Sequence, residues 1–200
     1  MIEIYLVGTV ATVPVVSHKS WGENFYKFTV DSARASGTID SLICIASEVY
    51  LDRITAGERV EIRGNIRSFK TTDGRCEIYV FADDVQSNPE TEDQNEVWGD
   101  AYISRVNEPR ETPLTHLIIA DVILKSVWGG DNNKYAYIPS IAWSRNAIRA
   151  AEMEIGTRVN VCGRFQSRQY VKALDNGETE LRTAYELSLA VIDEMEVKDA

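Results

Sequence analysis

The feature that most constrains this 200-residue sequence is an internal repeat at an offset of 99 residues. In each copy a short helical pattern ends at a glycine, and an alternating strand with a second, central glycine follows. The matched positions are Gly57, Val60, Ile62, Gly64, Ile66 and Ser68 in the first copy, and Gly156, Val159, Val161, Gly163, Phe165 and Ser167 in the second. A gapless match of this kind predicts one structural unit present twice, whereas the alternative is two unrelated strands that happen to alternate.

The first half of the chain has the pattern of a small β-domain. Alternating apolar residues and turn residues predict strands at 3–16, 24–32, 39–46, 59–69 and 76–85. The first strand should bend at Gly8 and end near Pro14, and residues 17–23 should form a loop. Ser47 is a plausible N-cap for a short helix at 48–55 that Gly57 ends, and residues 72–74 suit a hairpin tip.

The second half repeats this order after a change of composition. Residues 87–96 are polar and acidic and contain one proline, which is typical of a linker. Beyond them the pattern predicts strands at 97–107, 115–125, 135–142, 158–171 and 180–192, a helix at 144–154, a turn at 128–134 and a hairpin tip at 175–177. The expected division is a first domain at 1–86, an acidic linker at 87–96, a second domain at 97–195 and a short tail at 196–200.

Five strands with a helix between the third and the fourth is the order of the OB-fold, a small and partly open barrel. Gly64 and Gly163 fit this fold, because a strongly coiled strand needs a residue without Cβ where it bends or where another backbone approaches. The predicted fold class is therefore all-β, with two tandem OB-fold five-stranded barrels.

Composition sets limits on function and location. No apolar run reaches the roughly 20 residues that a membrane helix needs, and the N-terminal residues lack the basic region of a signal peptide, so we expect a cytoplasmic protein with no membrane partner. The scattered Cys44, Cys76 and Cys162 argue against a disulfide framework or a zinc site and indicate buried or half-buried free thiols. The net charge of −10 disfavours non-specific duplex binding, but it leaves room for a local basic groove.

One stretch departs from this acidic background. Residues 135–172 hold six basic and two acidic residues, a local net charge of +4, with aromatic residues between them. Arginines that track phosphates and rings that stack on bases are the usual combination for binding a single strand of nucleic acid. The stretch therefore predicts a single-stranded nucleic-acid site in the second barrel.

The sequence also resembles bacterial single-stranded-DNA-binding proteins, in particular the two-OB-domain kind found in low-GC Gram-positive bacteria and their mobile elements. The resemblance covers nearly the whole chain outside the linker. It rests on residues 109–114, 137–139, 142–147, 163–170 and 182–188 in the second half, and on 17–18, 22–26, the 34–37 turn and 63–68 in the first. It implies sequence-nonspecific binding and protection of single-stranded DNA in replication, recombination or repair. It further implies a homodimer with four OB-folds, and replication or repair proteins as possible partners.

The candidate nucleic-acid-binding residues of the second half each have a structural alternative. Arg164 and Arg168 lie four apart on one strand face and could track phosphates, or they could form a solvated face paired with Glu180 and Glu186. Tyr170 could stack on a base or pack within its hairpin, and Trp143 could be a stacking platform or a core side chain beneath the helix. The other second-half candidates are Arg145, Lys172, the pair Tyr135 and Tyr137 on the third strand, and Trp128, which we expect to be exposed in its Gly-rich loop.

The first half carries a weaker version of the same pattern. Arg63, Arg67 and Lys70 echo the basic row, with Phe69 as the ring, but Glu58, Glu61 and Glu77 dilute the charge. We therefore expect the second barrel to bind more strongly.

Enzymatic chemistry has little support in the sequence. His18 and His116 have no ligand-spaced partners, and no Ser/His/Asp or phosphate-loop pattern occurs. The adjacent Asp83 and Asp84 could bind a metal ion, as in an OB-fold nuclease, but a solvated strand end is the more ordinary explanation. The sequence predicts a non-enzymatic protein without metal or cofactor. The main alternative is a protein-interaction module of a replication or conjugation complex in which DNA binding is weak or lost.

Overall fold

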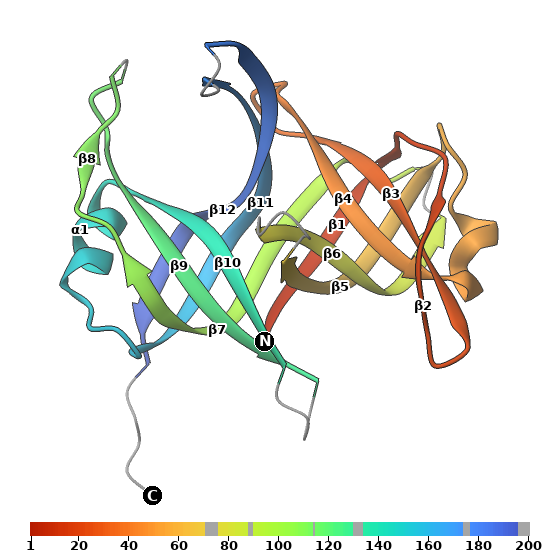
Figure 1. Cartoon of the computed structure of the whole chain (residues 1–200), viewed down its shortest axis with the longest axis horizontal. Coiled ribbons are helices and arrows are strands. Elements are labelled where there is room, and N and C mark those ends of the chain that lie inside the picture. Colours follow the sequence, from red (N-terminus) through yellow and green to blue (C-terminus); the bar gives the residue numbers. More distant parts are fainter. Residues whose placement is uncertain (71–75, 88–89, 114, 130–133, 174–176, 196–200) are drawn as a thin grey trace, which may run out of the picture.

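The computed structural model describes residues 1–70, 76–87, 90–113, 115–129, 134–173 and 177–195, with the side chain of Lys70 left out. The first half has six strands, because the predicted first strand is interrupted after Val10; five of them close into a barrel, and the short second strand pairs with the third alone (Figure 1). Its elements are β1 (Ile2–Val10), β2 (Val15–Ser20), β3 (Glu23–Ala33), β4 (Ile39–Ser47), the 3₁₀ helix η1 (Glu48–Arg53), β5 (Arg59–Lys70) and β6 (Cys76–Ser87).

The second half repeats the arrangement beside the first (Figure 1). Its elements are β7 (Gln94–Val106), β8 (Arg110–Glu111), β9 (Ile118–Trp128), β10 (Lys134–Trp143), the helix α1 (Arg145–Glu152), β11 (Arg158–Ala173) and β12 (Thr179–Glu194). In both halves a helical segment separates the third long strand from the final hairpin. The predicted class, all-β with two tandem OB-fold barrels, is confirmed.

Three sequence predictions about local structure need correction. Residues 17–23 are not a loop, because β2 runs to Ser20 and forms a hairpin with β3 through a turn at Trp21 and Gly22, both with positive φ. The linker predicted at 87–96 is shorter, since β6 reaches Ser87 and β7 already begins at Gln94. The short strand β8, which pairs with β9, was not expected. The tip predicted at 72–74, the first two residues of the tip predicted at 175–177, and most of the 128–134 turn lie outside the described residues.

The central glycines of the repeat mark the same irregularity in both barrels. The register of β5 against β6 shifts between Arg63 and Gly64, and that of β11 against β12 shifts between Cys162 and Gly163. A Cβ on Gly64 would lie 2.1 Å from the Phe81 carbonyl oxygen, and one on Gly163 would lie 2.1 Å from the Ser188 carbonyl oxygen. A bulge with close backbone approach therefore explains why each strand has glycine there.

The two barrels share a continuous sheet through β1 and β7. Ile4 pairs with Gly64 in its own barrel and Val97 pairs with Gly163 in the other, so Ile4 and Val97 are equivalent positions of the repeat. These two residues also face each other in the antiparallel β1–β7 ladder. Equivalent residues that face each other in this way flank a two-fold axis, so the barrels are related by a pseudo-two-fold axis that passes between Ile4 and Val97.

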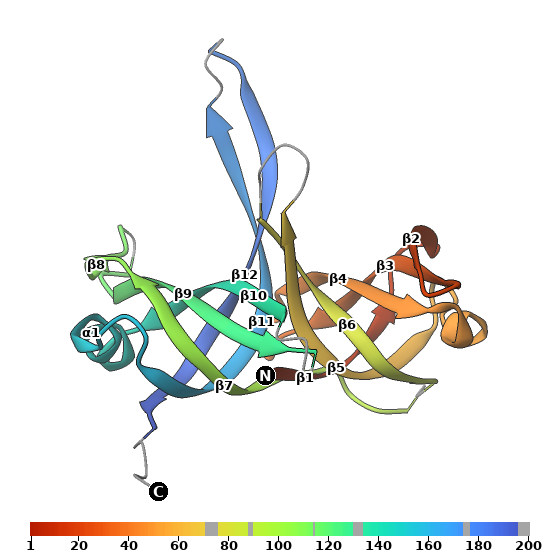
Figure 2. The same cartoon turned by 60° about the horizontal axis from the view of Figure 1, so that its bottom comes forward.

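The last matched serines of the repeat hold the barrels together. The Tyr137 amide donates to the Ser68 hydroxyl at 2.8 Å, and the Ser41 amide donates to the Ser167 hydroxyl at 3.0 Å. Each bond therefore joins one barrel's long hairpin to the other barrel's third long strand. The β11–β12 hairpin extends well beyond both barrels (Figure 2).

The described part of the chain settles two smaller questions. Cys44 is buried, and burial raises the pKa of its thiol, but Cys76 and Cys162 are exposed, so the expectation of buried or half-buried thiols holds for one of the three. No described helix is both long enough and apolar enough to cross a membrane.

Candidate nucleic-acid interface

The strongest candidate site is a groove on the seam between the barrels, called here the seam groove. Its floor is the β11–β12 hairpin, one wall is the β3–β4 turn of the first barrel, and the other wall comes from β8, β9 and the end of β10. The charged and aromatic residues that line it are Arg34, Arg110, Asp121, Trp143, Arg164, Arg168, Tyr185 and Glu186. Both barrels thus contribute arginines to one groove, and Trp143 supplies an aromatic ring.

Arg164 is the least neutralised cation of this groove. Its side chain is half-buried, and its Nε has no hydrogen-bond partner among the residues that the structure describes. In the described part of the chain, one of its terminal nitrogens donates to the Gln166 side-chain oxygen at 3.5 Å. Burial, followed by the nearby positive charge of Arg34, lowers the Arg164 pKa, although the charge of the Asp40 carboxylate acts in the opposite direction. An unpaired, partly desolvated guanidinium is unfavourable for folding but well prepared for an anion.

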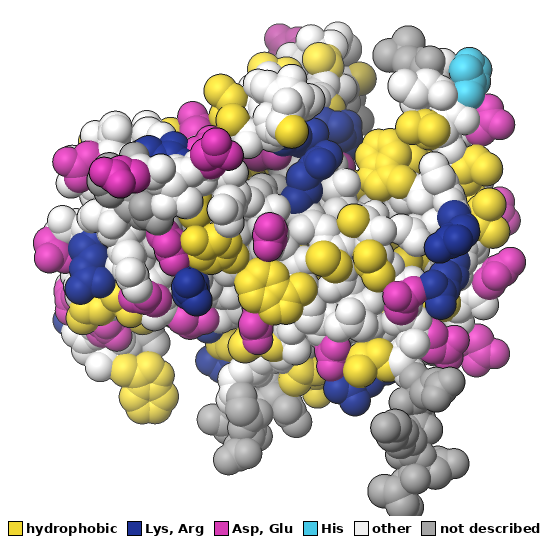
Figure 3. All heavy atoms as spheres, turned by 180° about the vertical axis from the view of Figure 1, so that it is seen from behind, with side chains coloured by type: hydrophobic (Ala, Val, Ile, Leu, Met, Phe, Trp, Pro, Cys, Tyr) yellow, Lys and Arg dark blue, Asp and Glu magenta, His cyan; other side chains and the backbone are white. Residues whose placement is uncertain are grey.

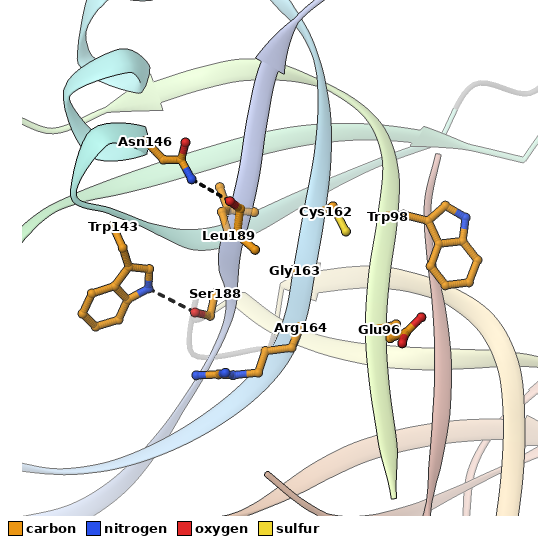
Figure 4. Close-up of a pocket in the computed structure, with 10 residues that line it drawn as sticks. Glu96, Trp98, Trp143, Asn146, Cys162, Gly163, Arg164, Ser188 and Leu189 are labelled. Atoms are coloured by element: carbon orange, nitrogen blue, oxygen red, sulfur yellow. Dashed lines mark hydrogen bonds between the residues drawn. The ribbon is translucent and has the colours of Figure 1, made fainter. Parts of the chain in front are cut away.

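Trp143 lies beside Arg164 and is not a core side chain. It is half-buried, its indole Nε1 donates to the Ser188 hydroxyl at 3.0 Å, and it lines both the seam groove and the adjoining hollow toward Trp98 (Figure 4). Of the two apolar neighbours whose burial would favour core packing of Trp143, Ile141 is buried but Ile148 is 46% exposed. The stacking interpretation therefore fits the geometry better than the core interpretation.

The backbone next to Trp143 is strained. Ser144 has φ 50° and ψ −119°, a conformation that non-glycine residues rarely adopt, and its side chain makes no capping bond to α1. Its amide donates to the Ile118 carbonyl at 2.7 Å, which holds this turn in place. Strain of this kind concentrates at functional sites, and here it lies between the candidate residues Trp143 and Arg145. Arg145 itself is exposed at the start of α1.

Arg168 continues the β11 row within the seam groove, and Tyr170 follows it just beyond the groove lining. The Arg168 Nε lies 3.8 Å from a carboxylate oxygen of Glu186, and its guanidinium lies 5.8 Å from the Tyr170 ring centre. Arg168 is thus exposed and loosely paired, so the predicted alternative of pairing with Glu186 is partly met. Lys172 is exposed and lies opposite Glu180 in the hairpin.

Tyr135 and Tyr137 lie in a separate hollow of the second barrel. Both rings are 47% exposed, and they share this hollow with Tyr102, Lys125 and residues of β7. The Lys125 ammonium lies 4.0 Å from the Tyr135 ring centre. This hollow combines rings and a cation, but the structure does not bring it together with Arg164 and Trp143.

The candidate residues of the first barrel are engaged by neighbouring side chains, in line with the acidic residues in that part of the sequence. Arg63 is exposed but is paired with Glu61 at 3.2 Å and lies near the Tyr5 ring. Phe69 is 41% exposed and packs edge-on against Tyr79. The side chain of Lys70 lies outside the described residues.

Arg67 and Trp128 contact each other between the two barrels, so their role is structural rather than in binding. The Arg67 guanidinium carbon lies 3.4 Å from the Phe81 ring centre and 4.0 Å from the Trp128 ring centre, so the cation is held between a ring of each barrel. The Lys134 ammonium lies 4.8 Å from the Trp128 ring centre. The expectation that Trp128 is exposed is therefore wrong, because the barrel contact half-buries it. Burial also lowers the Arg67 pKa.

Replacing Trp128 with alanine should weaken the barrel contact and leave strand binding nearly unchanged. Loss of a half-buried aromatic side chain and of its cation–π contact should cost about 2–3 kcal/mol, and should lower the melting temperature by roughly 5–10 °C. Calorimetry and oligonucleotide anisotropy on the same variant measure the two quantities. A large loss of affinity with unchanged stability would contradict the structural role.

Arg34 and Arg110 are the groove residues that the sequence predictions missed. Arg34 lies in the turn between β3 and β4, which was recognised only as part of a resemblance, and Arg110 lies at the unexpected strand β8. Arg110 is paired with Asp121 at 2.9 Å. Neither residue lies near the β11 row in sequence, so only the packing of the two barrels reveals them. Asp83 and Asp84 belong to no cluster of potential metal ligands in the described residues.

The two-barrel architecture matches that of solved structures. A crystal structure of the single-stranded DNA binding protein from Thermus aquaticus matches with a TM-score of 0.75 and 16% identity, covering 100% of this chain and 95% of that one. A deletion mutant of the same protein matches with a TM-score of 0.75 and 15% identity, covering 100% and 97%. The chain has the two-barrel fold of these proteins.

The remaining comparisons add no weight to this. The N-terminal domain of PriB from Thermoanaerobacter tencongensis is 33% identical over 44% of this chain and 97% of that one, with a TM-score of 0.40, too low to carry an argument. No protein-family profile matches the sequence, and no curated protein matches it.

Proposed function

We propose that this protein binds single-stranded DNA without strong sequence preference and protects it during replication, recombination or repair. The observation that carries the proposal is the seam groove, in which Arg164, whose Nε has no partner among the described residues, lies beside the half-buried Trp143. A strand offers phosphates at regular spacing and base faces that any aromatic ring can stack on, which matches this pair of side chains. The fold shared with two crystal structures of a single-stranded DNA binding protein supports the same class of ligand.

The proposed binding is noncovalent and rests on phosphate contacts and base stacking. Arg164 and Arg168 would contact successive phosphates along β11, and Trp143 would stack on a base at the end of β10. Tyr170, Lys172 and Arg145 would extend the same binding surface. A further segment of the DNA strand would bind Tyr135 and Tyr137 in the separate hollow of the second barrel. The first-barrel residues Arg63 and Phe69, with Lys70, would contribute less.

A gel-shift experiment tests the proposal directly. A labelled single strand of mixed sequence should be shifted, and unlabelled oligo-dT should compete for it while a duplex of the same length competes poorly. Equal competition by the duplex, or no shift at all, would count against the proposal.

We also propose that two chains associate, which would bring four OB-folds into one unit. The face around the pseudo-two-fold axis supports this, because Trp98 is 40% exposed there and Val191 is 38% exposed. Seen from behind, hydrophobic side chains lie across the middle of the molecule, with Lys and Arg side chains above them (Figure 3). Light scattering should give the mass of a dimer, and a monomer would overturn this part. Membership in the low-GC Gram-positive, two-domain kind and contact with replication or repair proteins remain predictions from the resemblance.

The alternative function is a protein-interaction module with weak or lost DNA binding. The net charge of −10 and the neutralised first-barrel pairs, Arg63 with Glu61 and Lys27 with Glu77, favour it. It predicts that substitution of Arg164 changes no interaction with nucleic acid.

A further inference from the structure

We propose that Arg164 of the second barrel and Arg34 of the first form one composite phosphate subsite in the seam groove, so that a bound strand contacts both barrels of a single chain. The inference rests on the proposed function and deepens it by naming where, and with which partners, a phosphate is held. It makes the packing of the two barrels a part of the binding site.

The first half of the subsite is Arg164. Its side chain extends from β11 toward the side where Trp143 lies, while Glu96 and Trp98 lie at the far end of the adjoining hollow (Figure 4). Among the described residues no carboxylate forms a salt bridge with it, and its Nε has no acceptor. The nearest anion that acts on Arg164 is the Asp40 carboxylate, which is already bonded to Arg34, so Arg164 still has donors free for a phosphate.

The second half is Arg34, which the first barrel fixes in place. Its Nε and one terminal nitrogen each donate to the wholly buried Asp40 carboxylate at 2.7 Å. Asp40 also accepts the Ser167 amide of the second barrel at 2.9 Å, so the same carboxylate orients Arg34 and ties the barrels together. These two bonds use one edge of the planar guanidinium, and its other terminal nitrogen remains to donate to a ligand.

The seam brings the two arginines to one place. Arg34 and Arg164 both line the seam groove, with Asp40 close to both of them. The hydrogen bonds to Asp40 raise the Arg34 pKa, so this carboxylate offsets part of the repulsion between the two arginines, and a phosphate between them would offset more of it. A DNA strand whose phosphate binds between Arg34 and Arg164 therefore crosses the junction of the two barrels. At this junction the hydrogen bond between Ser41 and Ser167 joins β4 to β11.

The test is a double-mutant cycle on the full chain, measured by anisotropy of a labelled oligo-dT at several salt concentrations. Arg164→Gln removes the unpaired cation. The combined Arg34→Gln and Asp40→Asn change removes the other guanidinium, keeps the net charge and leaves an oxygen for the Ser167 amide. Arg149→Gln is the control, because Arg149 is an exposed arginine on α1 that pairs with Asp193.

We expect Arg164→Gln to weaken binding roughly tenfold, and to reduce the slope of log K against log salt by about 0.7, as for one lost phosphate contact. Its melting temperature should be unchanged or higher, since a merely structural arginine would destabilise the fold when removed. The Arg34 and Asp40 pair of changes should also weaken binding. All three changes together should cost clearly less than the product of the separate effects, because both arginines hold the same phosphate.

Other outcomes would contradict either the composite subsite or the proposed function. Independent effects whose fold-changes multiply, or a normal affinity for the Arg34 and Asp40 variant, would overturn the composite subsite while the proposed function stands. If that variant does not unfold cooperatively, Arg34→Lys replaces it, and unchanged affinity for Arg34→Lys overturns the inference. If the wild-type protein itself fails to bind oligo-dT, the proposed function fails first. A loss with Arg149→Gln as large as with Arg164→Gln would mean that net charge alone is measured.

Discussion

Replacing Gly163 with alanine is expected to lower the melting temperature by roughly 6–12 °C. The new Cβ would lie 2.1 Å from the Ser188 carbonyl oxygen and 3.1 Å from the Leu189 Cα, so it would meet backbone rather than a movable side chain. Relief would require β11 and β12 to separate at their bulge, at an estimated cost of about 3 kcal/mol. Differential scanning calorimetry measures the change.

The repeat supplies the controls for this prediction. Gly64→Ala should behave alike, because its Cβ would lie 2.1 Å from the Phe81 carbonyl oxygen. Gly156→Ala has open space around the new Cβ but a φ of +93°, so it reports the cost of backbone conformation alone, about 1–2 kcal/mol. If Gly163→Ala proved no more destabilising than Gly156→Ala, the close approach of β11 and β12 would be wrong.

Replacing Trp143 with alanine is expected to weaken binding of oligo-dT by roughly 10- to 100-fold. Loss of one base–aromatic stack costs about 1–3 kcal/mol, and Trp143 lines the groove together with Arg164. Trp143→Phe should retain most of the affinity, because it keeps a ring that can stack on a base. It loses only the hydrogen bond to the Ser188 hydroxyl. Anisotropy titration of the three proteins measures the effect.

An abasic strand separates stacking from any wider damage to the site. It has the phosphates but no bases, so wild type and Trp143→Ala should bind it with similar affinity. The Arg164→Gln variant should still bind it more weakly than wild type. A loss with Trp143→Ala that is equally large on the abasic strand would show that Trp143 supports the groove rather than stacking on a base.

The fold could be predicted from the sequence because its main signals are local. Alternation defined the strands around Gly64 and Gly163, and the 99-residue repeat showed that one domain occurs twice. The β2–β3 hairpin was missed because its turn places Trp21, a bulky residue, at a φ of 53°, where glycine, asparagine or aspartate would have given the signal. Pairing with β3, rather than local preference, makes residues 15–20 a strand.

The candidate site was only partly predictable, because it depends on how two barrels pack. Arg164 and Trp143 were found from their own stretch of sequence, and the structure brings them together. Arg34 could not be linked to them, since 130 residues separate it from Arg164 in the chain. The expectation for Trp128 failed for the same reason, because a residue that seemed to lie in an exposed loop packs on Arg67 of the other barrel.

The most direct test of the central claim is a tryptophan-fluorescence titration with a long oligo-dT over a series of salt concentrations. Trp143 in the groove should make binding visible as saturable quenching. The proposal predicts that log K falls linearly with log salt, by about 0.7 for each phosphate that an arginine or lysine neutralises. An absence of quenching at low salt, together with an unshifted oligonucleotide in a gel, would contradict single-strand binding and favour a protein-interaction module.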